Sequence, residues 1–202
     1  MRFDLKRRGL LIVISAPSGG GKSAVLRRLL AADPTLSYSI SYTSRPPRGD
    51  EVDGRHYHFV SRERFEEMAA ANEFYEFAEV HGNLYGTCAK VIDESIDGGR
   101  DVAMDLDVQG GLNVKLRRSR AVLVFLMPPS IELLEERLRG RASDSEEQIQ
   151  LRMKNARREI EHWDQYDYIV MNRELETTVE AVRAIVQAER CRAARFKLIR
   201  ES

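Results

Sequence analysis

The chain has 202 residues, of which 43% are hydrophobic and 32% charged, and its 32 basic and 32 acidic side chains balance to a net charge of zero. This length allows one sizeable core with a small inserted lobe, and the composition is typical of a soluble globular protein, not a disordered one. A neutral balance gives no general attraction to nucleic acid or to an acidic membrane, so we expect neither as a partner.

The cysteines and the N-terminal segment bear on the compartment. Cys88 and Cys191 are too few for a disulfide framework and form no Cys-x-x-Cys metal motif, and we expect Cys88 to be a small buried side chain. The apolar run GLLIVI at residues 9–14 follows basic residues but is too short to span a membrane. We therefore expect a cytoplasmic protein. The sequence does not indicate its oligomeric state.

The stretch SAPSGGGKS at residues 15–23 lies between that apolar run and a helix-like segment at residues 24–32. A buried strand, a glycine-rich turn and a helix in this order are the context of a phosphate-binding P-loop. The glycines let the backbone approach an anion closely, and successive N–H groups converge on phosphate oxygens at the helix N-terminus. Lys22 supplies a charge for the β- and γ-phosphates, and the Ser23 hydroxyl can bind Mg²⁺.

One position departs from the strict P-loop pattern, which has glycine where this chain has Ala16. The alternative to a triphosphate site is an ordinary glycine-rich turn. An ordinary turn does not need three consecutive glycines, each of which adds to the entropy lost on folding. We therefore expect triphosphate binding by Ala16, Pro17, Ser18, Gly19, Gly20, Gly21, Lys22 and Ser23.

Strand-like and helix-like segments alternate along the rest of the chain. Residues 36–44 alternate in polarity like one strand, whereas residues 121–127 form the continuous apolar run of a strand covered on both faces. Other strands are expected at residues 56–60, 74–80, 84–87, 101–107 and 166–172, and helices at residues 62–71, 89–96, 109–117, 131–141, 145–163 and around 179–186. This order predicts an α/β fold with a parallel sheet and helices on both faces.

Serines mark the starts of three helices. Ser61 and Ser130 are expected N-caps, and Ser145 with Gln148 has the spacing of a capping box. The basic tail at residues 190–200 is interpreted as a solvated helix face and not as a nucleic-acid site.

Five stretches together resemble the guanylate kinase family, in the family's order and near its spacing from about residue 10 to about residue 190. They are SAPSGGGKS (15–23), SYTSRPPRGDEVDGRHYHF (41–59), NEFYEFAEVHGNLYGT (72–87), DLDVQG (105–110) and PPSIELLEERLRGR (128–141). Bacterial members often carry SAPSG in the loop, which accounts for Ala16. The resemblance implies phosphorylation of GMP to GDP, and of dGMP to dGDP, by ATP with Mg²⁺.

The resemblance also implies the domain organisation. We expect a P-loop NTPase three-layer fold forming a single domain over residues 1–202, with a central parallel sheet, an inserted β-rich lobe for the nucleoside monophosphate and a helical lid. The core is expected at residues 1–36, 91–136 and 148–202, the acceptor lobe at 37–90 and the lid at 137–147.

Guanine presents N–H donors at N1 and N2 and an acceptor at O6, so its site needs a carboxylate facing the donors and hydroxyl groups facing O6. Glu76 matches the family's carboxylate, and Ser41 and Thr87 match its hydroxyl positions. The alternative for Glu76 is a solvated strand residue. Such a site discriminates against adenine because buried polar groups would be left unpaired.

Positive charge and fixed geometry are needed around the acceptor phosphate. Arg45 and Arg48 offer planar bidentate forks, in a segment that could otherwise be a charged, proline-stiffened surface loop. By resemblance, Tyr57 and Tyr85 donate to the same phosphate and Glu51 orients the arginines. Asp107 matches an acid near the acceptor nucleoside.

Asp105 ends the strand expected beside the P-loop strand, where these folds hold Mg²⁺; the alternative for Asp105 and Asp107 is helix capping. Arg137, Arg141 and Arg152 resemble the family's clamp on the transferring phosphates, although arginine on an exposed helix face is common. Asn172 resembles its adenine contact. Catalysis is therefore expected to depend on Lys22, Arg45, Arg137, Arg141 and Arg152.

Two alternatives to this activity remain. The chain could be a guanylate-kinase-like binding module, although such modules typically lack the intact Gly21-Lys22-Ser23 that is present here. It could also be a ribose bisphosphate phosphokinase of the same fold, but the presence of Arg45 and Glu76 is evidence against that activity. No Ser-His-Asp or Cys-His grouping is evident, which agrees with an acceptor phosphate that is already anionic and needs no general base.

Overall fold

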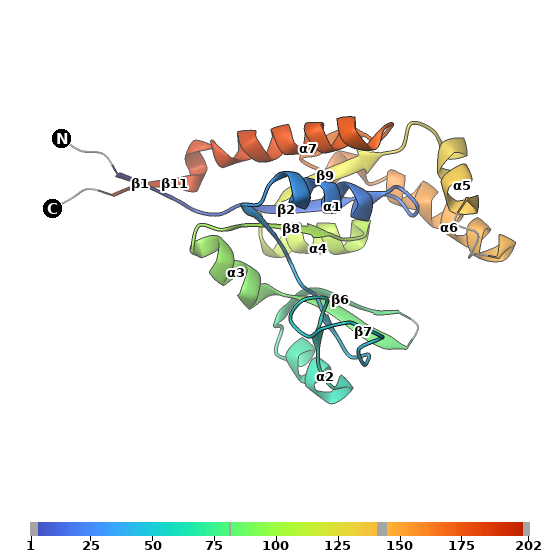
Figure 1. Ribbon diagram of the computed structural model, residues 1–202, viewed down its shortest axis with the longest axis horizontal. Coiled ribbons are helices and arrows are strands. Elements are labelled where there is room, and N and C mark those ends of the chain that lie inside the picture. The colour runs from blue at the N-terminus through green and yellow to red at the C-terminus, as the bar shows by residue number, and fades with distance from the viewer. Residues whose placement is uncertain (1–3, 81, 141–144, 200–202) are drawn as a thin grey trace.

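The computed structural model describes residues 4–80, 82–140 and 145–199, and its centre is a five-stranded parallel sheet (Figure 1). The strands are β10 (Tyr168–Met171), β9 (Val122–Met127), β2 (Leu11–Ser15), β8 (Asp101–Asp105) and β3 (Leu36–Tyr38), in that spatial order. Each neighbouring pair is parallel. The predicted α/β fold with a central parallel sheet is confirmed.

Helices cover both faces of this sheet. The α1 (Lys22–Ala32) and α7 (Leu175–Arg190) helices lie on one face, and α3 (Ala89–Asp97) and α4 (Val108–Arg117) lie on the other (Figure 1). Alternate residues of β2 pack against the helices on the two faces of the sheet. Ile12 lies in one buried cluster with Val182 of α7, and Val13 lies in another with Val114 of α4. A strand buried on both sides has no polar face, which explains its continuous apolar sequence.

A second sheet forms the inserted lobe, with strand order β5 (His58–Phe59), β4 (Tyr42–Thr43), β7 (Asn83–Cys88) and β6 (Phe74–Val80). The α2 helix (Arg62–Ala70) covers it, and its N-cap is the predicted Ser61, whose Oγ accepts from the Arg64 N–H at 3.1 Å. Phe65 stacks on Phe74 with ring centroids 4.4 Å apart. Cys88 is buried in the same cluster, as predicted.

The single strand predicted at residues 36–44 is wrong. The structure has β3 in the central sheet and β4 in the lobe, and the Ser39 N–H donates to the Ala103 carbonyl just after β3 ends. The chain therefore passes from core to lobe after Tyr38, and the expected start of the lobe at residue 37 falls within β3. Alternation of polarity along one segment carries no information about which partner strand each part pairs with.

The helices on either side of the expected lid are α5 (Ile131–Arg139) and α6 (Glu146–Ile160), at one end of the sheet (Figure 1). Ser130 caps α5, and the capping box of Ser145 and Gln148 is present. The helix expected to reach residue 163 ends at Ile160, before the 3-10 turn η1 (Trp163–Gln165). No helix in the described part of the chain is both long and apolar enough to cross a membrane.

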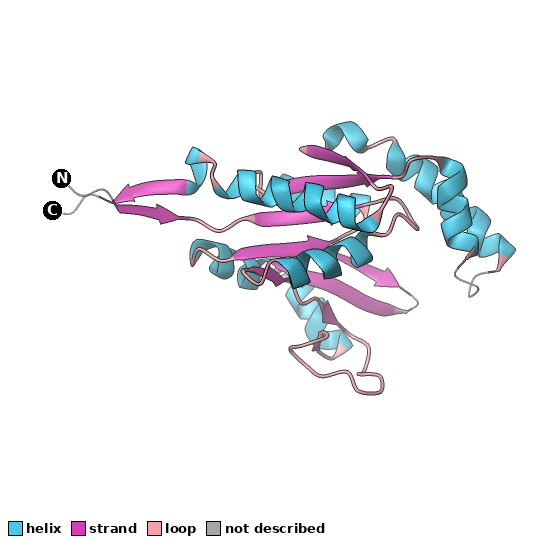
Figure 2. Cartoon of the chain, turned by 45° about the horizontal axis from the view of Figure 1, so that its top comes forward, coloured by secondary structure: helices cyan, strands magenta, loops and turns pink. Residues whose placement is uncertain are grey.

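The interpretation of residues 190–200 as a helix face is wrong. The α7 helix ends at Arg190, the turn η2 (Ala193–Arg195) follows, and β11 (Phe196–Ile199) pairs antiparallel with β1 (Asp4–Arg7). The two strands form a ribbon that extends from the body, as Figure 2 shows. At the turn between α7 and β11, the Arg195 guanidinium donates a hydrogen bond to the buried Glu189 carboxylate at 2.7 Å.

Candidate active site

The P-loop joins the carboxyl end of β2 to α1, and its glycines adopt conformations that other residues rarely take. Gly19 and Gly21 both have φ of 83°, in the left-handed region. A Cβ on Gly20 would lie 2.7 Å from both the Ala16 Cβ and the Pro17 carbonyl oxygen. The three glycines are therefore required by the turn, and Ala16 fits because Gly20 has no side chain.

Asn172, at the end of β10, holds this loop. Its Nδ2 donates to the Gly20 carbonyl at 2.6 Å, and its Oδ1 accepts from the Thr178 hydroxyl at 3.0 Å. Asn172 is buried, so its predicted contact with adenine would have to use the remaining amide N–H or the second lone pair of Oδ1. Thr178 was not predicted, because nothing in the α7 sequence indicates its partner.

A cavity of about 390 Å³ opens beside the loop, lined by Gly19, Gly21, Arg137, Gly140, Asn172 and Leu175 among others. The Arg137 guanidinium donates to the main-chain oxygens of Asn172 and Arg173, at 3.2 and 3.3 Å. Arg137 therefore contacts the wall of this cavity. A cavity of this volume is in the range of small-molecule sites.

Ser23 and Asp105 lie together because β2 and β8 are neighbours in the sheet. The Ser23 hydroxyl donates to Asp105 Oδ2 at 2.6 Å, and the Tyr38 hydroxyl lies 3.3 Å from Asp105 Oδ1. Burial, and then the charge of Asp105, raise the pKa of Tyr38, which keeps its hydroxyl protonated. Tyr38 was missed because its strand was assigned to the lobe.

The donor set at this point suits Mg²⁺, which prefers oxygen ligands and is usually bound by one or two carboxylates together with substrate phosphates. Ser23 and Asp105 supply a hydroxyl and a carboxylate next to the loop. The described residues contain no group of three or more His, Cys, Asp or Glu side chains that could hold a metal by itself.

In the lobe, Glu51 holds Arg45 in place. Both carboxylate oxygens accept from the guanidinium, at 2.6 and 2.7 Å, and Arg45 lies 5.1 Å from the Tyr57 ring centroid. The hydrogen bonds from Arg45, followed by one from the Arg48 backbone N–H, lower the pKa of Glu51 to about 2. Arg45 is buried, whereas Arg48 is exposed.

Two tyrosines flank this arginine. The Tyr57 and Tyr85 rings lie 5.9 Å apart at their centroids, and Tyr85 is opposite Thr43 in the β4–β7 pair. The half-buried Ser41 lies just before β4 and its carbonyl accepts from the His58 N–H. Of the predicted phosphate-binding residues of the lobe, Tyr85 therefore lies on β7, and Arg45, Arg48 and Tyr57 lie in the connection between β4 and β5.

Glu76 is not the solvated strand residue of the alternative interpretation. The Thr87 hydroxyl donates to its Oε1 at 2.6 Å across the β6–β7 pair. Burial raises the pKa of Glu76, which the Thr87 hydrogen bond partly offsets and the nearby charge of Asp107 reinforces. A Cβ on Gly110 of α4 would lie 3.5 Å from Glu76 Cγ, so the lobe reaches the core here.

Asp107 also caps α4, since its Oδ1 accepts from the Gly110 N–H at 2.7 Å. The helix-capping alternative therefore holds for Asp107, next to Glu76. Asp105 instead contacts Ser23. One short segment, residues 105–107, thus connects the P-loop half of the site with the lobe half.

The predicted arginine clamp is brought together only in part. Arg137 contacts the main chain beside the P-loop, and Arg152 is half-buried on α6. Arg141 lies outside the described residues. Lys22 is the half-buried first residue of α1, at the end of the loop.

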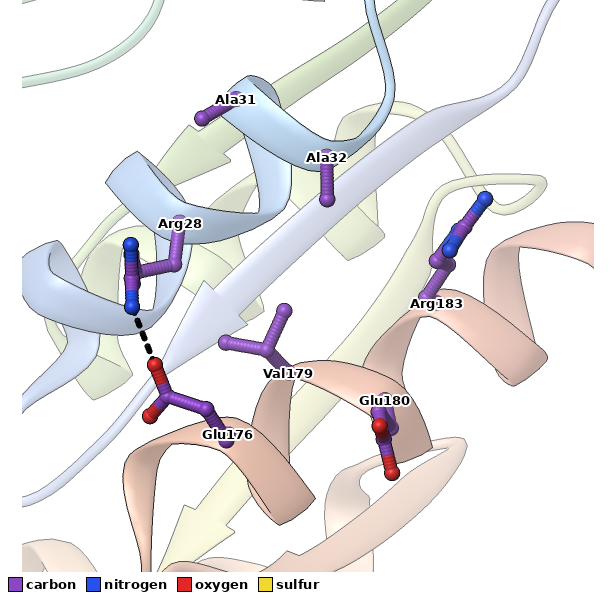
Figure 3. Close-up of a pocket in the computed structure, with 7 residues that line it drawn as sticks. All are labelled: Arg28, Ala31, Ala32, Glu176, Val179, Glu180 and Arg183. Atoms are coloured by element: carbon purple, nitrogen blue, oxygen red, sulfur yellow. Dashed lines mark hydrogen bonds and ion pairs between the residues drawn. The ribbon is translucent and has the colours of Figure 1, made fainter.

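A second groove lies between α1 and α7 and contains none of the predicted site residues. It measures about 360 Å³, and its open mouth is lined by charged side chains around Ala31, Ala32 and Val179 (Figure 3). Arg28 and Glu176 form an ion pair across it.

Comparison with known proteins identifies the family. The guanylate kinase family model matches residues 8–189. The chain belongs to the guanylate kinase family. It is 48% identical over 194 residues to the guanylate kinase of Rhizobium meliloti, covering 96% of this chain and 89% of that protein. It is 48% identical over 192 residues to the guanylate kinase of Paramagnetospirillum magneticum, covering 95% and 90%.

Solved structures agree. The crystal structure of guanylate kinase from Anaplasma phagocytophilum superposes with a TM-score of 0.74 at 33% identity, covering 96% of this chain and 92% of that one. The P-loop NTPase fold predicted for the chain is therefore confirmed.

Proposed function

We propose that this chain transfers the γ-phosphoryl group of ATP to GMP, and to dGMP, giving ADP and the guanosine diphosphate. The observation that carries this proposal is the hydrogen-bonded pair of Glu76 and Thr87, which the segment 105–107 connects to a P-loop. A buried carboxylate beside a hydroxyl is the donor-and-acceptor pattern that guanine requires, and adenine would leave it unpaired.

On the donor side, the backbone N–H groups of residues 19–23 and the Lys22 ammonium bind the β- and γ-phosphates. The adenosine occupies the cavity of about 390 Å³ beside Asn172. Ser23 and Asp105 would hold Mg²⁺, which would supply positive charge to the triphosphate of ATP.

On the acceptor side, Glu76 accepts hydrogen bonds from the guanine N1–H and N2–H₂ groups, and the Ser41 hydroxyl donates to O6. The Thr87 hydroxyl, which donates to Glu76 when no substrate is present, turns to O6 when guanine binds. Arg45, Arg48, Tyr57 and Tyr85 bind the phosphate of GMP, with Arg45 oriented by Glu51. Asp107 lies beside the nucleoside.

The chemical step is a displacement at phosphorus. A phosphate oxygen of GMP attacks the γ-phosphorus of ATP, a new P–O bond forms, and the bond to the β,γ-bridging oxygen breaks as ADP leaves. The attacking oxygen is anionic near neutral pH, so no general base is required. Lys22 and the arginines Arg45, Arg137, Arg141 and Arg152 stabilise charge on the transferring group.

Water must be excluded while the two substrates are aligned, because it would otherwise accept the phosphoryl group. We expect the lobe after Tyr38 and the lid at residues 137–147 to close over the bound substrates. The single-domain organisation with its core, lobe and lid, and a cytoplasmic setting, remain predictions.

Transfer of label tests this proposal. ATP labelled at its γ-phosphorus is incubated with GMP and Mg²⁺, and we expect labelled GDP in a stoichiometry of one per ADP released. Release of labelled inorganic phosphate without labelled GDP, or no turnover by a folded chain, would contradict it.

A further inference from the structure

The tip of the P-loop is in contact with both helices that flank the lid. The backbone N–H of Ser18 donates to Glu159 Oε2 of α6 at 2.8 Å. The next residue, Gly19, packs so closely on α5 that a Cβ there would lie 2.8 Å from Leu138 Cδ2. Two consecutive residues of the loop are therefore held by two different helices.

The two helices pack against each other through a small shared core. Leu138 of α5 packs with Ile149 and Met153 of α6 in one buried cluster. Glu159 lies about two turns after Arg152 on α6, which places both residues on the same side of that helix. A change in the position of α6 would therefore move the Glu159 carboxylate and the Arg152 guanidinium together.

A carboxylate beside a phosphate-binding loop is unfavourable for an anionic ligand, so its presence requires a compensating role. Hydrogen bonds from a backbone N–H to an ionised carboxylate are shorter and stronger than neutral ones. The loop is held from the other side by Asn172, which donates to the Gly20 carbonyl. Glu159 and Asn172 thus hold the loop from α6 and from the end of β10.

We propose that Glu159 is a positioning residue that holds Ser18 so that the following N–H groups converge on the phosphates, and that it couples ATP binding to the position of α6. This inference rests on the proposed function only in taking ATP as the ligand. Glu159 does not contact substrate itself; it acts through the Ser18 backbone.

Three variants test the role of Glu159. Glu159→Ala removes the hydrogen-bond acceptor, Glu159→Gln keeps an acceptor oxygen but removes the charge, and Glu161→Ala removes an exposed carboxylate at the end of the same helix. The dissociation constant of ATP–Mg²⁺ is measured by calorimetry without GMP, followed by the KM values for ATP and GMP.

For Glu159→Ala we expect ATP binding and the KM for ATP to weaken about tenfold, as the loss of one charge-assisted hydrogen bond implies, while the KM for GMP stays within about twofold. Glu161→Ala should bind ATP within about twofold of wild type, and Glu159→Gln, whose neutral amide oxygen makes a weaker hydrogen bond, should lie between wild type and Glu159→Ala. Unchanged ATP affinity in a folded Glu159→Ala, or a Gln variant as defective as Ala, would overturn the inference.

Amide hydrogen exchange on the unmodified chain tests the same contact without substitution. We expect the Ser18 amide to be protected, and ATP to increase protection of the α6 segment around Glu159. An unprotected Ser18 amide, or no response of α6 to ATP, would overturn the inference. Because ATP binding is measured without an acceptor, these results stand whether or not GMP proves to be the substrate.

Discussion

The Thr87 hydroxyl donates a 2.6 Å hydrogen bond to the carboxylate of Glu76 across the β6–β7 hairpin. The bond orients the carboxylate when no substrate is present, and Glu76 Cγ lies close to Gly110 of the neighbouring α4 helix. Replacing Glu76 by Gln puts an amide N–H₂ where the guanine donors need an acceptor. We expect Glu76→Gln to lower kcat/KM for GMP at least about 100-fold, with ATP affinity unchanged.

The matched control for Glu76→Gln is Glu79→Gln on the same strand. Glu79 is exposed and pairs with Arg62 on the surface, so its substitution should leave kcat/KM for GMP within about twofold. Equal losses in the two variants, or full activity in Glu76→Gln, would remove Glu76 from the guanine site.

The raised pKa of Glu76 predicts that a rise in pH lowers the stability of the folded chain and increases its affinity for GMP. In the folded chain burial favours the neutral carboxyl, so the folded state binds the proton more tightly than the unfolded state and loses stability as pH rises through the folded pKa. Substrate binding needs the carboxylate. GMP affinity should therefore fall as pH drops through the same pKa.

Denaturant titrations at several pH values check the first effect. Without substrate, Glu76→Gln should be more stable than wild type at pH 7, and the advantage should disappear in acid below the usual glutamate pKa. An advantage that is independent of pH would show that Glu76 is already ionised without cost.

Glu51 holds Arg45 through both of its oxygens, so it controls the geometry of the acceptor phosphate site. Glu51→Gln loses the charge and half of the paired arrangement, and we expect the KM for GMP to rise about tenfold. Asp50→Asn, the exposed neighbour, is the control and should have a wild-type KM. Initial rates at saturating ATP measure both; indistinguishable variants would refute the orienting role.

Lys22 supplies the mobile charge at the end of the P-loop. Lys22→Ala should reduce kcat below about one thousandth of wild type, because the transferring phosphoryl loses a direct cationic contact. GMP binding, measured by calorimetry without ATP, should remain within about twofold. A variant that turns over normally would contradict the assignment.

The features that were predicted correctly from the sequence are those with local sequence patterns. The β2–loop–α1 unit, the three helix caps and the buried position of Cys88 depend on residues close together in the chain, and they were predicted. The ribbon of β1 and β11 was not, because each strand is only four residues long and pairs only with the opposite terminus. The division between β3 and β4 was missed for a related reason, since pairing partners are chosen in three dimensions.

The candidate site, too, could be predicted from the sequence only in part. The family resemblance placed Glu76, Thr87 and Arg45 on segments that the fold brings near one another. It could not reveal Tyr38 beside Asp105 or Glu159 beside Ser18, because each of these contacts joins segments that the sequence separates. Thr178 beside Asn172 is only six residues away, but this contact depends on how the chain turns from β10 into α7. Such supporting contacts become visible only when both segments have been positioned.

The comparison of acceptors by the rate of ADP release tests the central claim most directly. With ATP and Mg²⁺ fixed, kcat/KM is measured for GMP, dGMP, AMP, CMP and UMP. We expect GMP and dGMP to be used and AMP to be at least about 100-fold poorer, because adenine leaves Glu76 and its hydroxyl partners unpaired. Activity with AMP equal to or greater than that with GMP would contradict the account.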